Sequence, residues 1–288
     1  ISAPLQILHF PSLAFIRSSA SFSFPSTLEV YGSIYFIIHG NPFNLEVVVD
    51  SWPDYQTVIT RPKKKEMVDK LDQYTNTYHI FTKDFHKCQQ FLETPGIIDW
   101  NQVIQIQGNQ SWDKILRKIA TSKSLQIEHL SNILFFLFLL FLYSKNLDFK
   151  FTSLNASHAK LVNDNWSMGL NEKSLNYVLH CIKNLPSFCL LNSEGNPISW
   201  YVLDQTCEIR MGFTLPKYQA KGIGTYLGAC IIQYLRKEEI PFFLHTEEKK
   251  KYLWGALTRL GFCSFPHGWN QWKLTPPKEK LIQIHSNI

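Results

Sequence analysis

The stretch 218–239, YQAKGIGTYLGACIIQYLRKEE, places Gly222, Gly224 and Gly228 directly before and inside a segment with the composition of a helix. The whole chain of 288 residues contains 13 glycines, so three within seven positions is a local concentration. Glycine in a helix interior costs roughly 1 kcal/mol relative to alanine. Because glycine lacks a Cβ atom, the pattern indicates that another group approaches this backbone closely.

The segments on either side predict what that group is. We expect a strand over 208–215, ended by Pro216, and a helix over 225–239, with 219–224 as the loop between them. The N–H groups of a helix's first turn and the positive end of its dipole form an anion site, and glycines leave room for a phosphate there. The loop therefore predicts a pyrophosphate ligand, although a tight strand–helix corner without a ligand is the alternative. Neither the G-x-G-x-x-G fingerprint nor a P-loop is present.

Length and composition predict two globular domains. The chain is about twice a typical ~150-residue domain, and 45% hydrophobic residues with 14% aromatics exclude wholesale disorder. The formal charge of +6 suits an anionic small ligand, a mitochondrial address or a membrane surface and selects none of them. No basic run exceeds three lysines, which argues against nucleic acid. The six cysteines lack C-x-x-C or zinc-ligand spacing, so we expect a reducing compartment and no metal.

Periodicity predicts an α+β fold in each half of the chain. In the first half we expect strands at 30–38, 45–50, 55–60, around Ile80 and at 103–107, and helices at 64–74, 84–93 and 111–122. In the second half we expect helices at 157–166, 172–185, 225–239 and 252–260, and strands at 187–191, 198–203, 208–215, 241–246, 262–265 and 269–274. The predicted domains are 26–130 and 149–276, with an ill-defined N-terminus over 1–25, an apolar linker over 131–148 and a tail over 277–288.

Two segments carry open alternatives. The run 133–143, ILFFLFLLFLY, is too short to span a ~30 Å hydrocarbon core as a helix. A buried strand or core helix is favoured over a membrane-surface contact or a wrongly spliced linker. Residues 1–25 are rich in Ser, Phe and Pro and lack acids, which is compatible with a transit peptide or with an ill-defined start.

The loop pattern Q-x-x-G-x-G between strand and helix resembles the acyl-CoA-binding loop of the GNAT superfamily of N-acetyltransferases. Wider stretches resemble the glycine N-acyltransferase family: SHAKLVNDNW (157–166), NEKSLNYVLHCIKNLP (171–186), NPISW (196–200), CEIRMGFTLPKY (207–218) and GWNQW (268–272) in the second half, and 30–62, DQYTNTYHIFTK (72–83) and VIQIQG (103–108) in the first. The resemblance covers roughly 28–128 and 149–275. It implies two acetyltransferase-like domains in tandem, with mixed central sheets flanked by helices, the first domain being degenerate.

The resemblance also implies the activity and the site. The family transfers an acyl group from acyl-CoA to the amine of glycine or, in some members, glutamine. Its proposed catalytic glutamate matches Glu208, which would act as general base; a strand-surface glutamate in a salt bridge is the alternative. Arg210 shares a strand face with Glu208 and is expected either to bind the amino-acid carboxylate or to form a salt bridge. The residues expected to hold CoA are Leu215, Gln219, Ala220, Lys221, Gly222, Ile223, Gly224 and Thr225.

Departures from the family pattern keep a second function open. Many acetyltransferases have a tyrosine as general acid where this chain has Leu257, and the segment after His245 lacks the usual asparagine, which puts CoA affinity in doubt. A non-catalytic acyl-CoA-binding protein of the same fold is therefore the alternative, and a lysine or amine acetyltransferase is a third hypothesis. His245 is interpreted as a core histidine, and Trp269 and Trp272 as core aromatics rather than pocket walls.

We expect no permanently bound cofactor and no metal, because acyl-CoA enters as a co-substrate. The expected partners are acyl-CoA and free glycine or glutamine, without nucleic acid or a transmembrane span, and the chain is expected to be a monomer. The family implies a mitochondrial location, with the endoplasmic reticulum as the alternative.

Overall fold

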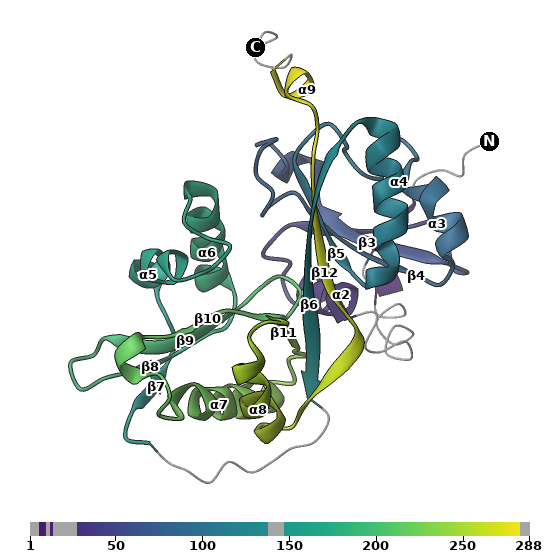
Figure 1. The fold of residues 1–288 in the computed structure, drawn as a ribbon. Coiled ribbons are helices and arrows are strands. Elements are labelled where there is room, and N and C mark those ends of the chain that lie inside the picture. The colour runs from purple at the N-terminus through teal and green to yellow at the C-terminus, as the bar shows by residue number, and fades with distance from the viewer. Residues whose placement is uncertain (1–5, 10–11, 14–27, 138–146, 283–288) are drawn as a thin grey trace. The chain divides into compact units, whose positions relative to one another are not determined.

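The computed structural model describes residues 6–9, 12–13, 28–137 and 147–282 (Figure 1). Most of segment 1–25, for which a transit peptide and an ill-defined start were the alternatives, lies outside the described residues. The part of the apolar run beyond Leu137 also lies outside them. The chain divides into two compact units, 1–132 with 267–288 and 133–266. The first unit thus includes a C-terminal segment that returns to it. The domain division expected from the sequence stays a prediction.

The first unit is built on a sheet of mostly antiparallel strands. Strands β1 (Gln6–Ile7), β2 (Leu45–Val49), β3 (Thr57–Pro62), β4 (Thr77–Thr82) and β5 (Ile104–Gly108) are neighbours in that order. The pairing of β4 with β5 is parallel. Strand β12 (Phe262–Thr275) then pairs antiparallel with β5 from Asn270 to Leu274, and β6 (Gln126–Leu137) lies next to β12. The strands predicted at 45–50, 55–60, around Ile80 and at 103–107 are confirmed.

Helices cover both faces of this sheet. One core cluster packs Tyr78, Ile106 and Trp272 against α3 (Phe85–Leu92) and α4 (Asp113–Lys123), which follows the short 3₁₀ turn η3 (Gln110–Trp112). Trp272 is fully buried there, as the core interpretation expected. A second cluster packs α2 (Leu28–Ile38) on β2 and β3. The last helix, α9, covers Lys278–Ile282.

The strand predicted at 30–38 is wrong, because this segment is the helix α2. Its β-branched and aromatic residues suit a strand, but Val30 and Ile34 point together into the second core cluster at helical spacing. The Ser33 hydroxyl donates to the carbonyl of Glu29 one turn back, at 2.8 Å. Gly40, at φ +105°, then ends the helix. Tertiary packing therefore overrides the local strand preference.

The helix predicted at 64–74 is also wrong beyond its first turn. Only η2 (Lys64–Glu66) is helical, and turns follow. The carboxylate of Asp69 accepts from the N–H of Leu71, and that of Asp72 accepts from the N–H of Tyr74. Such local side-chain bonds satisfy the backbone in a non-helical conformation and so compete with the helix.

The second unit carries a four-stranded antiparallel sheet in the order β10-β9-β8-β7, formed by Ile209–Thr214, Pro197–Leu203, Ser187–Leu191 and Lys150–Thr152. Helices α5 (Ala159–Asp164) and α6 (Glu172–Asn184) precede β8, with the turn η4 (Ala156–His158) before α5. After β10 come η5 (Pro216–Tyr218), α7 (Ile223–Lys237), β11 (Leu244–Glu247) and α8 (Lys251–Arg259). The predicted order of helices and strands from α5 to α8 is confirmed, whereas β7 was not predicted and the strands predicted at 262–265 and 269–274 form the single strand β12. Gly261 follows α8 at φ +92°.

The apolar run is a strand as far as it can be followed. Residues 133–137 form the end of β6, and Leu134 and Phe135 are buried. This part fits the favoured interpretation of a buried strand. Within the described ranges, the chain contains no helix whose length and hydropathy would let it span a bilayer.

Candidate active site

A short, tightly bonded turn positions the candidate base. The Oδ1 atom of Asp204, at the end of β9, accepts hydrogen bonds from the backbone N–H and the hydroxyl of Thr206 at 2.8 and 2.6 Å, and from the N–H of Glu208 at 3.2 Å. Cys207 adopts φ +64° in the same turn. The N–H of Ile209 then donates to the carbonyl of Phe243 at 2.8 Å, in a parallel bridge. The turn therefore holds Glu208 at the start of β10.

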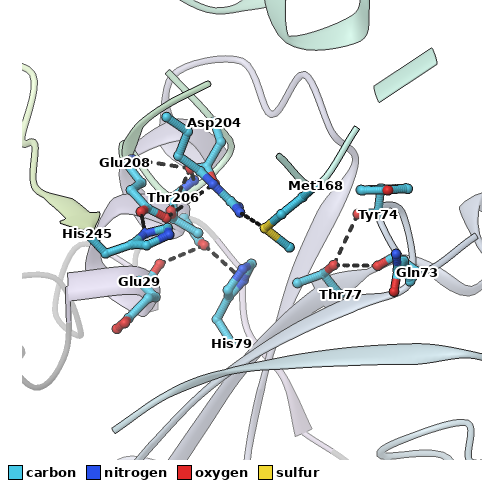
Figure 2. Close-up of polar contacts among 12 residues, drawn as sticks. Glu29, Gln73, Tyr74, Thr77, His79, Met168, Asp204, Thr206, Glu208 and His245 are labelled. Carbon is cyan, nitrogen blue, oxygen red and sulfur yellow. Dashed lines mark hydrogen bonds and ion pairs between the residues drawn. The ribbon is translucent and has the colours of Figure 1, made fainter. Parts of the chain in front are cut away.

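The two carboxylate oxygens of Glu208 have different surroundings (Figure 2). Glu208 is completely buried, and its Oε1 forms a hydrogen bond with Nδ1 of His245. Its Oε2 lies 3.6 Å from Nε of Arg210 and has no hydrogen-bond partner among the described residues. Buried polar atoms are usually satisfied, so an unsatisfied oxygen on a buried carboxylate marks a functional candidate.

Arg210 is held mainly by Asp204. Its NH1 lies 3.1 Å from Oδ2 of Asp204, both side chains are almost completely buried, and the guanidinium lies 5.6 Å from the ring centre of Trp166. Its NH2 also contacts the sulfur of Met168 at 3.6 Å. The structure thus shows Arg210 in a salt bridge, one of the two roles expected for it. Its contact with a substrate carboxylate stays a prediction.

His245 is the site residue that sequence reasoning missed. It lies on β11, with 14% of its side chain exposed, and bonds to Glu208 across 37 positions of sequence. Burial lowers the pKa of His245 to about 4, with Asp204 and Glu247 acting to raise it and Lys250 to lower it. One sequence signal could have predicted that His245 lies near Glu208. The segments β10, α7 and β11 form a strand–helix–strand unit, and such a unit brings its two strands side by side in parallel.

The predicted anion loop joins β10 to α7. Leu215 follows the end of β10 and is the N-cap residue of η5, the Gln219 amide donates to the carbonyl of Thr214 at 2.7 Å, and Ala220 adopts φ +59°. Gly222 is the N-cap of α7 at φ +78°, and none of the described side chains caps this helix end. The N–H groups of the first turn, at Ile223, Gly224 and Thr225, are therefore left for an anionic ligand or water. Lys221 is exposed beside them.

The three clustered glycines have different causes. Gly222 needs its left-handed backbone to begin the helix at the loop. At Gly228, an added Cβ atom would lie only 2.7 Å from Cδ1 of Leu260, so this glycine permits close packing rather than ligand approach. An added Cβ at Gly224 would make an ordinary contact of 3.4 Å with the Thr214 hydroxyl. The pattern thus combines one loop requirement with one packing requirement.

Strand β10 is an edge strand with a bulge. Its register against β9 shifts between Arg210 and Phe213, and Met211 in the bulge adopts φ +55°. On its other side, the one backbone bridge found among the described residues joins Glu208 to Phe243, which lie directly before β10 and β11. Edge strands present N–H and C=O groups to a further chain. An extended amide-containing ligand can therefore pair along β10, between Glu208 and the anion loop.

Other candidates contribute less to this chemistry. Leu257 lies on α8 and carries no proton to donate, and Lys250 begins that helix without a side-chain cap. In the parts of the chain that the structure describes, no group of three His, Cys, Asp or Glu side chains is placed to hold a metal ion.

Comparison with known proteins places this geometry in a family. The family profile described as aralkyl acyl-CoA:amino acid N-acyltransferase matches residues 5–186, and the profile of its C-terminal region matches residues 188–276. The human glycine N-acyltransferase-like protein 2 is 44% identical over 292 aligned positions, covering 95% of this chain and 99% of that protein. The mouse glycine N-acyltransferase is 42% identical, covering 88% of this chain and 92% of its own length.

Solved structures confirm the fold. The crystal structure of a Drosophila protein superposes with a TM-score of 0.77 at 17% identity, covering 95% of this chain and 98% of that protein. An acetyltransferase of the GNAT family from Colwellia psychrerythraea superposes with a TM-score of 0.50 at 9% identity, covering 95% of this chain and all of that protein. The predicted α+β fold of the acetyltransferase type is therefore confirmed.

Proposed function

The chain belongs to the aralkyl acyl-CoA:amino acid N-acyltransferase family, and from this premise we propose that it transfers an acyl group from acyl-CoA to the amine of glycine. Glutamine is the alternative acceptor. Relatives that match most of the chain are named glycine N-acyltransferase or glycine N-acyltransferase-like protein, which supports glycine as the first choice. The observation that carries the proposal is the buried carboxylate of Glu208, whose Oε2 lacks a hydrogen-bond partner among the described residues. Glu208 lies directly before β10, the strand that leads into the anion loop.

Glu208 would act as the general base. Glycine is mainly an ammonium ion at neutral pH and cannot attack a thioester until one proton is removed. Glu208 takes that proton directly or through one water. The amine nitrogen then bonds to the thioester carbon, and the C–S bond breaks with its electron pair leaving on sulfur. The nitrogen loses its second proton as the amide forms, one proton ends on the CoA thiol, and one is released to solvent.

The leaving group explains why Leu257 does not exclude this reaction. A thiol has a pKa near 8.5, so CoA departs as a thiolate without a strong acid beside it. A tyrosine at this position would therefore add to the rate but is not required for C–S cleavage. The oxyanion formed during attack needs a donor, and backbone N–H groups of the bulged part of β10, around Met211, are the candidates.

The anion loop would hold the CoA pyrophosphate. The first-turn N–H groups of α7 supply donors, Gly222 lets the phosphate approach, and Lys221 adds a positive charge. Ile223 is buried, so it contributes its N–H group rather than its side chain. The amides of the pantetheine arm would pair with the edge of β10 from Leu215 back towards Glu208.

CoA-thiol release by the purified chain tests the proposal. Benzoyl-CoA and oleoyl-CoA are each supplied with glycine, with glutamine and without an acceptor. We expect release that depends on glycine, which would establish the reaction and identify the acyl class at the same time. CoA binding without acceptor-dependent release would overturn the catalytic proposal in favour of the non-catalytic alternative.

The location and assembly are also part of the proposal. The family resemblance and the mildly basic charge of +6 support a mitochondrial location, with the endoplasmic reticulum as the alternative. We propose a monomer that uses acyl-CoA as a co-substrate rather than a bound cofactor. Import of the tagged full chain into isolated mitochondria, compared with microsomes, would test the location.

A further inference from the structure

The contact between Glu208 and His245 separates the roles of the two carboxylate oxygens. Oε1 is engaged by Nδ1 of His245, whereas no described residue offers a hydrogen bond to Oε2. Both oxygens are equally basic in an isolated carboxylate, so only their surroundings can decide which one receives a proton. Figure 2 shows the imidazole on one side of the carboxylate and the turn of Asp204 and Thr206 on the other.

The ionisation states fix where the shared hydrogen belongs. The proposed base role requires Glu208 to be ionised, and a carboxylate has no proton to donate, so the hydrogen in this bond comes from Nδ1 of the imidazole. Burial keeps the pKa of His245 near 4, so the ring is neutral at pH 7 and carries a single proton. The charged and titratable groups that face it are Glu208, Asp204, Glu247 and Lys250. A weakly basic, neutral ring is a hydrogen-bond donor here rather than a proton acceptor.

Arg210 forms its hydrogen bond with Asp204 rather than with Oε2 of Glu208. The Arg210 guanidinium lies 3.1 Å from Oδ2 of Asp204 but 3.6 Å from Oε2 of Glu208. The first distance is that of a charge-assisted hydrogen bond and the second is beyond it. Arg210 therefore forms its shorter contact with Asp204, and Oε2 of Glu208 remains able to accept a proton.

We propose that His245 is a positioning residue for the acyl transfer, in which its neutral imidazole donates from Nδ1 to Oε1 of Glu208 and leaves Oε2 as the oxygen that accepts the amine proton. This inference rests on the proposed function, because it assigns a role within that reaction. It makes a specific claim about one nitrogen, since Nε2 of His245 takes no part in the proton transfer.

Two substitutions distinguish this positioning role from a proton relay through Nε2 and from no role at all. His245→Asn keeps an N–H group at nearly the position of Nδ1 and removes Nε2, whereas His245→Phe removes both nitrogens. We expect kcat with glycine to stay within about threefold in H245N and to fall on the order of 10- to 100-fold in H245F. The KM for acyl-CoA should change little in either variant. Thermal unfolding of both variants checks that they fold.

The pH profile supplies a readout that a purely structural role would not move. A hydrogen bond to the carboxylate favours its charged form, so losing that bond makes Glu208 easier to protonate. The acidic limb of kcat against pH should therefore move to higher pH in H245F and stay in place in H245N. An equal loss of kcat in both variants would mean that Nε2 relays the proton, and unchanged kcat in H245F would mean that His245 has no role; either result overturns the proposal.

The tautomer of His245 can be measured without turnover. ¹⁵N NMR of the full chain at pH 7 should show a neutral imidazole protonated at Nδ1, identified by loss of its signals in H245N. A proton on Nε2 alone, or a doubly protonated ring, would overturn the proposal. If the wild-type chain releases no CoA in the presence of an acceptor, the proposed function fails. The tautomer measurement would still show whether Nδ1 of His245 donates to Glu208.

Discussion

Asp204→Asn tests whether the buried charges around Glu208 act as a unit. The substituted side chain keeps an oxygen that can accept the three hydrogen bonds of the turn, but it loses the charge that faces Arg210. Removing one partner of a buried ion pair typically costs about 3–5 kcal/mol. Because Glu208 remains 3.6 Å from the guanidinium and compensates in part, we expect a loss near the lower limit, about 3 kcal/mol.

The assay is urea unfolding at pH 7, followed by intrinsic fluorescence, with thermal unfolding as a second measure. A loss of about 3 kcal/mol corresponds to a decrease in Tm of about 6–12 °C for a protein of this size. Asp164→Asn is the matched control, since Asp164 pairs with Lys160 at 2.5 Å on the surface, where 45% of its side chain is exposed. That exposed pair should contribute less than about 1 kcal/mol despite its shorter distance.

A double substitution and the pH profile complete the test. Asp204→Asn combined with Arg210→Met removes both charges, and should recover part of the stability that the single substitution loses. Freed from Asp204, Arg210 would pair with Glu208 in the single variant, so the acidic limb of kcat should move to lower pH, opposite to H245F. Equal stability of the Asp204 and Asp164 variants, or a double variant less stable than the single one, would refute the reasoning.

Three further outcomes are expected. Glu208→Gln should lower kcat at pH 7 by about 10²–10⁴-fold, with part of the loss recovered at high pH where more amine is free; full activity at pH 7 would contradict the assignment. Gly222→Ala should raise the KM for acyl-CoA about tenfold or more and cost about 1 kcal/mol, because its backbone is left-handed, whereas Gly255→Ala on α8 should leave KM unchanged. The pKa of His245 falls from 6.5 to about 4 on folding, so the unfolded chain binds more protons between these values. Stability should therefore fall as the pH drops through this window, by on the order of 3 kcal/mol, and urea unfolding of H245N should show a smaller fall.

Local sequence signals predicted most of the second unit. Asn171 caps α6 by accepting from the N–H of Ser174, and Gly195 turns the hairpin between β8 and β9 at φ +81°. In each case the helix cap or the turn is created by the side chain or the backbone preference of the residue itself. The same kind of signal predicted the anion loop through Gly222 and the strand that carries Glu208 and Arg210.

Signals of this kind failed at two segments of the first unit, for different reasons. Residues 30–38 have strand-forming side chains and yet form α2, because the helix buries Val30 and Ile34 in a core that the sequence does not display. Residues 64–74 have helix-forming lysines and glutamate, yet Asp69 and Asp72 bond to their own backbone and turn the chain.

The sequence by itself determined the fold class, the strand–loop–helix of the anion site and the candidate base. Only the tertiary structure decided how that base is held: His245 reaches Glu208 from 37 positions away, and Arg210 contacts Asp204 more closely than Glu208. It also decided that Asn270 on β12 pairs with Gly108 on β5. The physical reason is that turns and helix ends depend on a few neighbouring residues, whereas side-chain partners depend on strand register and chain crossings, which no local preference encodes.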